Sequence, residues 1–464
     1  MLISKVLKGT WFLPESDIKV KGRLFTKKSE MYLEVLNPLK SKRVPSYESF
    51  EFIHGITYDQ KPVTLYKCSE SLSVIHDEEN SITIHRVRFI IENGLFTTEN
   101  FLFNCVEFYP SNFEEWLNLK PFKRIKGQNN NSFEHLAIED ITEEIVPGLN
   151  LIISFFQNVS TSTTNTLELS TTASIKMTSD KKLSFDDWFE KVTHFSNFLA
   201  LSYGKFCPVI SLCLSNLDVI EKYSMVIDGH DFGHEEVVEH KVSYQVEKSF
   251  EKNSRFIHHI RMLFLYTDIK SDFATILEKW YAIRDNVRPI LNLLLENILR
   301  NGVFNENNFL NSAHALESFH RRFRVNKVLE DDVYKQRVKN ILDSVDEEYK
   351  VWLSPRLEHG NEPSLHARLE EILQEVDGSF IQSAIKEKAK FIIQFKNSRN
   401  YYTHYDKKLQ KKALKPTELF YLARKTDYIV LLLLLKESGI SFENLDRLFS
   451  KQLTMGLLFD KYSF

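Results

Sequence analysis

The spacing of apolar residues changes once along this 464-residue chain, and that change limits the folds open to it. Before about residue 250, short apolar runs alternate with polar neighbours and are separated by turn residues, which is typical of antiparallel strands. After that point, apolar residues recur at steps of three and four, which indicates amphipathic helices. The sequence therefore predicts an α+β protein, with a β-rich, antiparallel, sandwich-like region over 1–250 and an all-α bundle over 251–464.

One hairpin stands out in the amino-terminal region. Apolar residues alternate with their neighbours over 87–91 and lead to Asn93 and Gly94, which favour the positive φ of a tight turn. The chain then returns through a second apolar run. One helix is expected near 185–203, because a Ser-x-x-Asp capping pair begins at Ser184 ahead of an amphipathic run.

In the carboxyl-terminal region, an apolar series from Phe273 to Ile298 indicates a long helix, which we expect to bend at Pro289 and to end at Gly302. This spacing recurs farther along the chain. Further helices are expected over 309–323, 333–352, 363–376, 380–405 and 416–439. Together these segments predict a helical bundle.

The charge of the whole chain provides no attraction to nucleic acid, because 63 acidic residues outnumber 60 Lys and Arg residues. The window 386–425 differs, since it holds twelve Lys or Arg residues against three acidic ones. Such a patch can hold an anionic partner, although a solvated, lysine-rich helix face also explains it. Any RNA contact is therefore expected in this window.

Cysteine usage and hydropathy indicate a cytoplasmic protein without disulfides. The four cysteines form no C-x-x-C pair, so we expect four buried thiols and no zinc ribbon. No signal peptide is recognisable, and the apolar run 429–435 is too short to span a membrane. Neither a P-loop nor a dinucleotide fingerprint occurs, and no cofactor is expected.

The segment KNSRNYYTHYDKK, residues 396–408, gathers the side chains that metal-free RNA cleavage requires. This reaction moves the 2′-OH proton, stabilises a negatively charged phosphorane and protonates the leaving 5′ oxygen. His404 is the candidate for proton transfer, because imidazole titrates near neutral pH. Arg399 is the candidate for stabilising the phosphorane, because its guanidinium stays protonated and forks onto phosphate oxygens. Asn400 can orient either of them.

Neighbouring side chains in the same segment are candidates for RNA binding. Aromatic rings can stack on the bases of single-stranded RNA, and ammonium groups can contact its phosphates. These candidates are Tyr401, Tyr402, Tyr405, Lys396, Lys407 and Lys408. Local ion pairs, for example between Arg399 and Asp406, are the alternative explanation for the charged residues.

The spacing of Arg399 and His404 restricts how they can act together. Positions five apart in a straight helix are separated by about 140° around the axis and about 7.5 Å along it. Fraying near the helix end, or two copies of the chain meeting across a two-fold axis, would bring the groups together. The dimeric site is the better hypothesis.

A second constellation, DGHDFGHEEVVEH, offers carboxylates and imidazoles at spacings that suit a transition metal. His230, His234 and His240 are its candidate ligands. Gly229 and Gly233 disfavour a helical ligand pair, so we expect a polar loop between strands and no metal.

Two further clusters have simpler explanations. His258 and His259 lie near Arg255 and Arg261, but the spacing is wrong for the arginine-first pattern at Arg399, and an amphipathic helix is expected there. Glu317 and His320 lie on one side of the second bundle helix. A carboxylate facing Arg399 is one interpretation of this pair, and an exposed polar face is the other.

The heptapeptide SRNYYTH, residues 398–404, resembles the R-x4–6-H signature of the HEPN superfamily (higher eukaryotes and prokaryotes nucleotide-binding), in which a polar residue such as Asn commonly follows the arginine. The opening GTWFLPESDIKVKGRL, with YLEVL after it, resembles that of ApeA-type anti-phage proteins, which join a β-rich region to a carboxyl-terminal HEPN domain. By motif position, Arg399, Asn400 and His404 take the family's catalytic roles. Glu317 matches nothing well enough to be carried over.

The resemblance implies a metal-independent endoribonuclease that acts as a homodimer through its HEPN domain. Such a protein answers a phage-derived trigger by cutting host RNA, either tRNA or other single-stranded loops, through 2′-OH transesterification. It is then a toxin of abortive infection, with region 1–250 sensing the trigger and region 251–464 cutting. One alternative is a noncatalytic RNA-binding and dimerisation module coupled to a phage-sensing β domain. A metal hydrolase that uses the three histidines of the second constellation is another.

Overall fold

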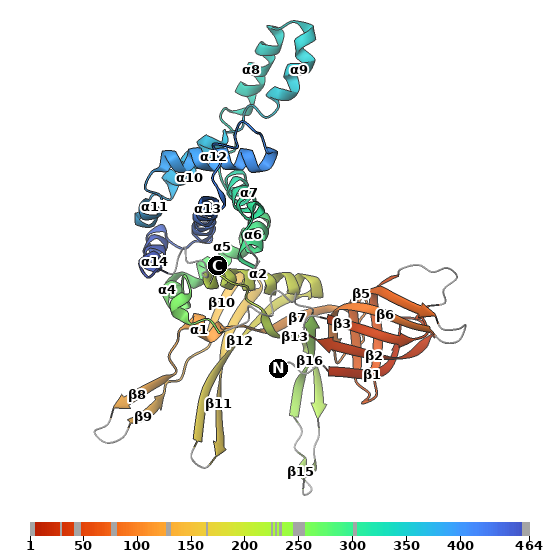
Figure 1. The fold of residues 1–464 in the computed structure, drawn as a ribbon. Helices are drawn as coiled ribbons and strands as arrows, with labels where there is room; N and C mark the ends of the chain where they lie inside the picture. The colour runs from red at the N-terminus through yellow and green to blue at the C-terminus, as the bar shows by residue number, and fades with distance from the viewer. Residues whose placement is uncertain are drawn as a thin grey trace. The chain divides into compact units, whose positions relative to one another are not determined.

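The computed structural model describes residues 5–27, 30–40, 48–75, 81–126, 131–163, 166–223, 226–227, 230–231, 234–244, 256–299 and 304–456. The chain forms two compact units, Met1–Lys270 and Ser271–Phe464. The first is rich in antiparallel strands and the second is helical, which confirms the predicted fold class (Figure 1). The units divide after the change of sequence pattern near residue 250.

Six strands of the first unit close into a barrel. They are β1 (Lys5–Phe12), β2 (Lys19–Lys27), β3 (Glu30–Leu36), β4 (Ser49–Thr57), β5 (Pro62–Ile75) and β6 (Ser81–Glu92). The order is β6-β3-β2-β1-β4-β5, and a further β5–β6 pairing closes the ring. The predicted antiparallel strands therefore wrap around one core instead of stacking as two facing sheets.

The same sheet continues beyond β6 through six further strands, in the order β16-β13-β7-β12-β11-β10. These strands are β7 (Leu102–Pro110), β10 (Ile141–Val146), β11 (Leu149–Thr163), β12 (Thr166–Ser184), β13 (Val209–Tyr223) and β16 (His234–Tyr244). Two small hairpins complete the unit. They pair β8 (Phe122–Lys126) with β9 (Asn131–His135), and β14 (Val226–Ile227) with β15 (His230–Asp231).

Small residues opposite a large one shape the barrel core. Trp11 on β1 is fully buried, and Gly55 is its register partner on β4. A Cβ atom added to Gly55 would overlap the indole ring of Trp11, so glycine leaves the space that the indole fills. Gly22 on β2 lies against the same ring, where a Cβ would come within 2.8 Å of Trp11 Cδ1.

The predicted helix near 185–203 is confirmed as α2 (Phe185–Tyr203). The Ser184 hydroxyl accepts a hydrogen bond from the Asp187 backbone N–H at 3.2 Å, which caps the first turn. Gly204 ends the helix in the left-handed conformation. The apolar face packs inward, and Trp188 donates from Nε1 to the Phe103 carbonyl at 2.9 Å.

The helix predicted around His258 and His259 is wrong. Residues 256–265 form one 3₁₀ turn, η1 (His259–Arg261), and are otherwise irregular, before α4 (Tyr266–Ile269) and η2 (Lys270–Asp272). Contacts to α1 (Phe113–Leu117) fix this segment, because Glu115 on α1 accepts from His259 Nδ1 at 2.9 Å. Bonds to another element replace those that a helix would make within itself.

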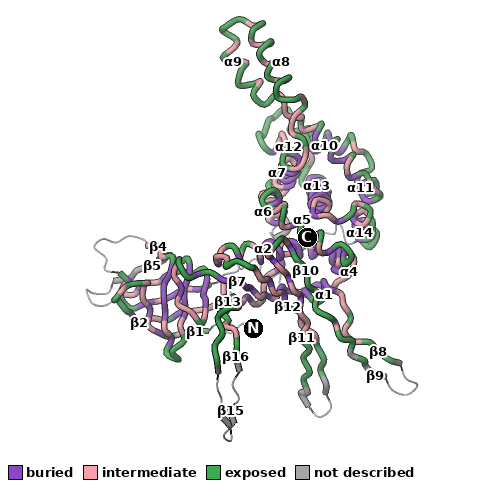
Figure 2. The backbone as a smooth tube through the Cα atoms, turned by 180° about the vertical axis from the view of Figure 1, so that it is seen from behind, coloured by how far each residue is buried: buried purple, intermediate pink, exposed green. Residues whose placement is uncertain are grey.

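The second unit contains ten α-helices within the residues that the structure describes. They are α5 (Phe273–Ala282), α6 (Arg284–Leu299), α7 (Glu306–Phe323), α8 (Asp331–Asp343), α9 (Glu347–Leu357), α10 (Leu365–Glu375), α11 (Ser379–Ala384), α12 (Lys388–His404), α13 (Pro416–Glu437) and α14 (Phe442–Thr454). The helix α13 is buried along most of its length, whereas α8 and α9 form a largely exposed hairpin (Figure 2).

Three predicted helices are interrupted. The long helix breaks at Ile283, and its second part, α6, continues past Pro289, while Gly302 lies outside the described residues. The segments 333–352 and 380–405 each form two helices. Among the described residues, no helix combines the length and apolar character that crossing a membrane requires.

Candidate functional site

The end of α12 carries the candidate catalytic residues. The helix stays regular up to His404, its last residue, and Tyr405 caps it in the left-handed conformation, with φ 50° and ψ 36°. Because the helix does not fray before His404, the angular separation of Arg399 and His404 is that of a regular helix. One chain therefore does not present both groups on the same face of α12.

Arg399 forms a two-pronged ion pair with a neighbouring helix. Its Nε donates to Oε1 of Glu317 on α7 at 3.0 Å, and its Nη2 donates to Oε2 of the same carboxylate at 3.2 Å. The two side chains are 24% and 19% exposed. Glu317 thus faces Arg399, and the alternative pairing of Arg399 with Asp406 is not what the structure shows.

The guanidinium keeps donors for a further ligand. Besides the two bonds to Glu317, Arg399 Nη1 donates to Oδ1 of Asn400 at 3.3 Å. A guanidinium has five N–H groups, so two remain, both on its terminal nitrogens. Glu317 and Asn400 therefore fix the plane of the guanidinium while leaving it able to donate to an anion.

His404 lies in a different environment. Its side chain is exposed, and no residue that the structure describes forms a hydrogen bond or ion pair with its ring. An imidazole that is open to solvent can exchange a proton with a bound substrate. Arg399 is thus held in place by its neighbours, whereas His404 is free to meet a ligand.

The three tyrosines of this segment differ in exposure. Tyr402 is buried and donates its hydroxyl to the Leu414 carbonyl at 2.8 Å, and burial raises its pKa. Tyr405 is 61% exposed, and Tyr401 is half-buried with its ring 5.5 Å from that of Tyr405. Tyr405 and Tyr401 are accessible for stacking on a base, whereas Tyr402 supports the loop that follows α12.

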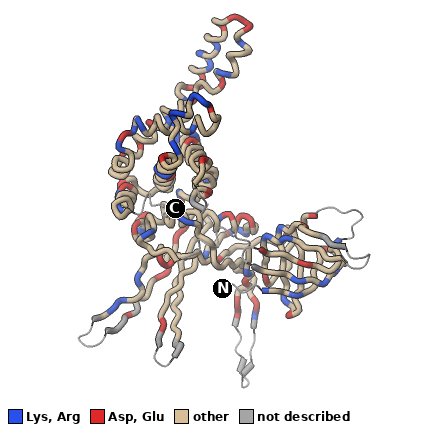
Figure 3. Tube along the Cα trace, in the orientation of Figure 1, with Lys and Arg blue, Asp and Glu red and all other residues tan. Residues whose placement is uncertain are grey.

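The basic window 386–425 covers α12, the loop after it and the first part of α13, and Figure 3 draws its Lys and Arg residues in blue. Lys396, Lys407 and Lys408 are exposed around the end of α12, as an RNA contact requires. Arg424, in contrast, is buried on α13, with its Nη1 3.6 Å from Oδ2 of Asp427. Part of the positive charge of the window is therefore structural.

Two family models match the chain. The model of ApeA N-terminal domain 1 matches residues 7–280, more than half of the chain, and the Apea-like HEPN model matches residues 310–444. The chain belongs to the ApeA family. No curated protein and no solved structure matches it.

Membership of the ApeA family supports a coarse function. The chain is an anti-phage HEPN protein, and HEPN domains are generally nucleases. The HEPN match includes Glu317, Arg399 and His404. The ApeA-family fold thus brings together a carboxylate and an arginine that lie 82 residues apart in the sequence.

His320, the neighbour of Glu317 on α7, has a structural role in this ApeA-family chain. Its ring is fully buried, with Nε2 2.8 Å from a Glu371 carboxylate oxygen and Nδ1 3.2 Å from Arg368 Nη1. Since arginine only donates, Nδ1 must accept, and the ring is then the Nε2–H tautomer. Both nitrogens are occupied, so His320 has no free position for a substrate.

The alternative metal site is not favoured by the ApeA-family fold. Asp228 lies outside the described residues, as do the side chains of His230 and His234. His240 lies on β16, six residues after His234, a distance of about 20 Å along a strand. Its ring packs 4.9 Å from that of Phe96, and burial lowers its pKa. The backbones of His234 and His240 lie too far apart along β16 for both residues to bind the same ion.

The cysteines confirm the expectation of free thiols. Cys68, Cys105 and Cys207 are buried and Cys213 is half-buried, and none forms a disulfide. Burial raises the pKa of the Cys207 thiol to about 12 and that of Cys213 to about 11. Protonated, enclosed thiols are poor nucleophiles.

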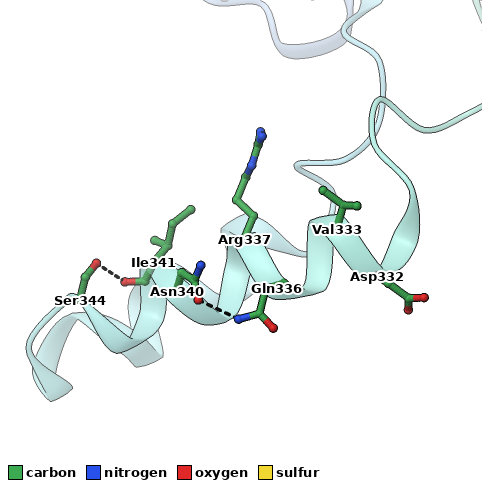
Figure 4. A pocket seen from close by; sticks show the side chains of 7 residues that line it. All are labelled: Asp332, Val333, Gln336, Arg337, Asn340, Ile341 and Ser344. Carbon is green, nitrogen blue, oxygen red and sulfur yellow. Dashed lines mark hydrogen bonds between the residues drawn. The ribbon is translucent and has the colours of Figure 1, made fainter.

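A hollow on α8 contains no catalytic arrangement. Its lining residues are Asp332, Val333, Gln336, Arg337, Asn340, Ile341 and Ser344. Figure 4 shows Arg337 and Asp332 extending in different directions, while Gln336 donates to Asn340 at 2.8 Å. No acid and base converge there, so the end of α12 remains the candidate site.

Proposed function

We propose that this ApeA-family chain is a metal-independent endoribonuclease that cuts host RNA during phage infection. His404 moves the proton between the 2′-OH and the leaving 5′ oxygen, and Arg399 stabilises the charge on the phosphorane. Asn400 supports Arg399, to which it is hydrogen-bonded. The coarse support is the match of the HEPN family model over 310–444.

The observation that carries the proposal is the state of Arg399. A guanidinium whose plane is set by a carboxylate, but which retains free N–H groups, is preorganised to bind a phosphate oxygen. An arginine serving only an ion pair does not need an exposed imidazole and a lysine-rich loop beside it. The combination fits the demands of phosphate chemistry.

The angular separation of Arg399 and His404 leads us to propose a homodimeric site. Since the two groups lie about 140° apart on one regular helix, a phosphate held by Arg399 of one copy is served by His404 of a second copy. A two-fold axis beside α12 would create two such pairs. In this arrangement a monomer is inactive.

The proposed substrate is a single-stranded segment, such as a tRNA loop. Tyr405 and Tyr401 offer accessible rings to unstacked bases, and Lys396, Lys407 and Lys408 offer charge to the phosphates. A phage-derived trigger acting through the β-rich unit would release the activity, and growth arrest would follow.

The experiment is a cleavage assay with the full-length protein, total RNA and EDTA. The wild-type protein should give fragments with 2′,3′-cyclic phosphate and 5′-OH ends. His404→Ala should lower the rate about 10³-fold, because proton transfer is lost, and Arg399→Ala about 10²-fold or more. The matched control is His359→Ala, which removes a 76% exposed histidine from the same unit. Cleavage by His404→Ala at the wild-type rate would refute the proposal.

The second candidate is a noncatalytic RNA-binding and dimerisation module. The pairing of Arg399 with Glu317 favours it, because an arginine engaged in an ion pair can also be purely structural. This module would shift RNA in a gel in a salt-dependent way and leave every strand intact. The same EDTA assay therefore separates the two functions.

A further inference from the structure

A hollow of about 650 Å³ lies in the helical unit, between α12 and α13 and the elements beside them. Its volume falls in the range of pockets that hold small ligands. Lys386, Lys390 and Lys425 contribute its cationic groups, and Gln394 and Tyr421 contribute an amide and an aromatic ring. None of these residues belongs to the pair formed by Arg399 and Glu317.

The positive charge of the hollow is only partly neutralised. Of its two carboxylates, Glu387 pairs with Lys390 of the same hollow at 3.4 Å, and Glu418 accepts from a backbone N–H at the start of α13. Among the described residues, no carboxylate forms an ion pair with Lys386 or Lys425. Burial and the nearby charge of Lys386 lower the pKa of Lys425. An anion bound in the hollow would offset the repulsion between the charges of Lys386 and Lys425.

Side chains suited to a nucleobase accompany the charge. Tyr421 is 41% exposed and can stack on a flat ring, while the half-buried Gln394 carries both a donor and an acceptor. Phosphate, ring stacking and an amide together are the features by which proteins recognise a nucleotide. A simple inorganic anion would use only the lysines.

One face of α12 connects this hollow with His404. Residues at steps of four and three share a helix face, and the series here is Lys390, Gln394, Asn397, Tyr401 and His404. All five side chains are exposed or half-buried. A strand that lies along this face can therefore reach from the imidazole to the hollow.

We propose that the hollow binds a nucleoside phosphate, supplied by an unpaired nucleotide of the RNA that His404 cleaves. Lys386 and Lys425 hold the phosphate, Tyr421 stacks on the base, and Gln394 bonds to the base edge. That this nucleotide belongs to an RNA strand rests on the proposed function, whereas the binding of a nucleoside phosphate in the hollow does not depend on it.

The test measures binding by full-length His404→Ala protein to a short, labelled, unstructured RNA in EDTA, by fluorescence anisotropy. In this His404→Ala protein, the further substitution Lys386→Glu should weaken RNA binding about tenfold. It should also make the plot of log affinity against log salt concentration less steep, by about 0.7 in slope. Tyr421→Ala should weaken it by a similar factor with little change in slope. Lys425→Gln, a milder change of a half-buried residue, should cost about threefold. The matched control is Lys339→Glu on α8, where the exposed lysine lies outside the hollow.

A competition arm identifies the source of the nucleotide. Free AMP should displace the RNA only at concentrations far above the RNA's own dissociation constant, because it offers one nucleotide where the strand offers several. AMP that binds as tightly as the RNA would overturn the RNA part of the proposal and assign the hollow to a free nucleotide. Unchanged affinity for both ligands in all three folded variants, checked by circular dichroism, would overturn the whole proposal.

Cleavage assays separate this proposal from the proposed function. In the protein that retains His404, Lys386→Glu should raise KM about tenfold and leave kcat near the wild-type value, since the hollow binds the RNA but takes no part in the reaction. If the variants cleave RNA with the KM and affinity of the wild-type protein, the nucleotide-binding role of the hollow is contradicted and the proposed nuclease function is not. If the protein never cuts RNA but its variants bind RNA more weakly, the nuclease function is contradicted and the role of the hollow is not.

Discussion

Arg399 and His404 lie on one helix but in contrasting surroundings. The arginine is half-buried and bonded to Glu317 and Asn400, whereas the imidazole is exposed at the last residue of α12. A group that must stabilise charge benefits from being held, and a group that must exchange a proton benefits from access. This difference leads to a prediction about Glu317.

Glu317→Ala should lower the RNA cleavage rate about tenfold to a hundredfold, because the guanidinium plane is no longer set by a carboxylate. Glu317→Gln should retain more activity, since the amide oxygen still accepts one of the two bonds. Single-turnover rates measure the effect. The control is Glu370→Ala, which removes a 62% exposed carboxylate from α10. Equal rates for Glu317→Ala and the wild-type protein would show that Glu317 does not position Arg399.

Asp427 gives a prediction about pH. Its carboxyl is buried on α13, where it accepts from Ser312 at 2.6 Å, and burial raises its pKa from 3.8 to about 6. The folded protein thus binds a proton more tightly than the unfolded chain, so the free energy of unfolding should fall as pH rises from about 4 to about 6. Relative to Asp427→Asn, the fall should be up to about 3 kcal/mol.

Chemical denaturation at a series of pH values measures this dependence. Because Asp427→Asn also removes the charge opposite Arg424, the comparison concerns the slope with pH and not the absolute stability. Parallel curves for the two proteins between pH 4 and 6 would contradict a raised carboxyl pKa.

The sequence identified Arg399, Asn400 and His404 as candidates but could not assign their surroundings. Spacing within α12 predicts which residues share its faces, yet it contains no information on which helix packs against each face. The contact of Glu317 with Arg399 therefore depends on how α7 packs against α12, which the sequence does not specify. The burial of Tyr402 beside the exposed Tyr405 depends on packing in the same way.

At the scale of elements, local signals predicted α2 correctly, but the hairpin expected through Asn93 and Gly94 is wrong, because β6 pairs with β3, β5 and β16 while β7 pairs with β12 and β13. The bounds of α2 follow from a capping serine and a terminal glycine, both of which act within one turn. The barrel, in contrast, also requires β1–β4 and β3–β6 pairing between strands that are not neighbours in the sequence, and the β5–β6 pairing then closes the ring. Alternating apolar residues suit a sandwich and a barrel equally, so the sequence pattern could not distinguish them.

Gly55→Ala should destabilise the first unit by about 3 kcal/mol, because the new methyl group overlaps the indole of Trp11 in a closed core. Thermal or urea unfolding of the full-length protein measures the change. In the double variant Trp11→Leu with Gly55→Ala, the added methyl should cost much less, since the smaller side chain leaves room for it. An equal cost in both backgrounds would show that the indole is not the obstacle.

For the whole molecule, the proposed composite site predicts complementation between inactive variants. A heterodimer of Arg399→Ala and His404→Ala contains one site with neither group and one site with both. Mixing the two proteins in equal amounts and allowing subunits to exchange should therefore restore about one quarter of the wild-type activity, because half of the dimers are mixed and each has one working site of two.

Each variant alone should stay inactive in the same assay, and size measurements should show dimers for all of them. If the mixture stays as inactive as its components while mixed dimers form, Arg399 and His404 act within one copy. That result would contradict the composite site without contradicting RNA cleavage.

The bond between Arg399 and Glu317 joins two helices, and this has a mechanical consequence. A slip of α7 against α12 by about 1 Å would stretch one prong of the fork beyond hydrogen-bonding distance and tilt the guanidinium. The orientation of the Arg399 guanidinium therefore depends on the position of α7 relative to α12. A distant event that shifts these helices would change how Arg399 binds phosphate without affecting the His404 imidazole.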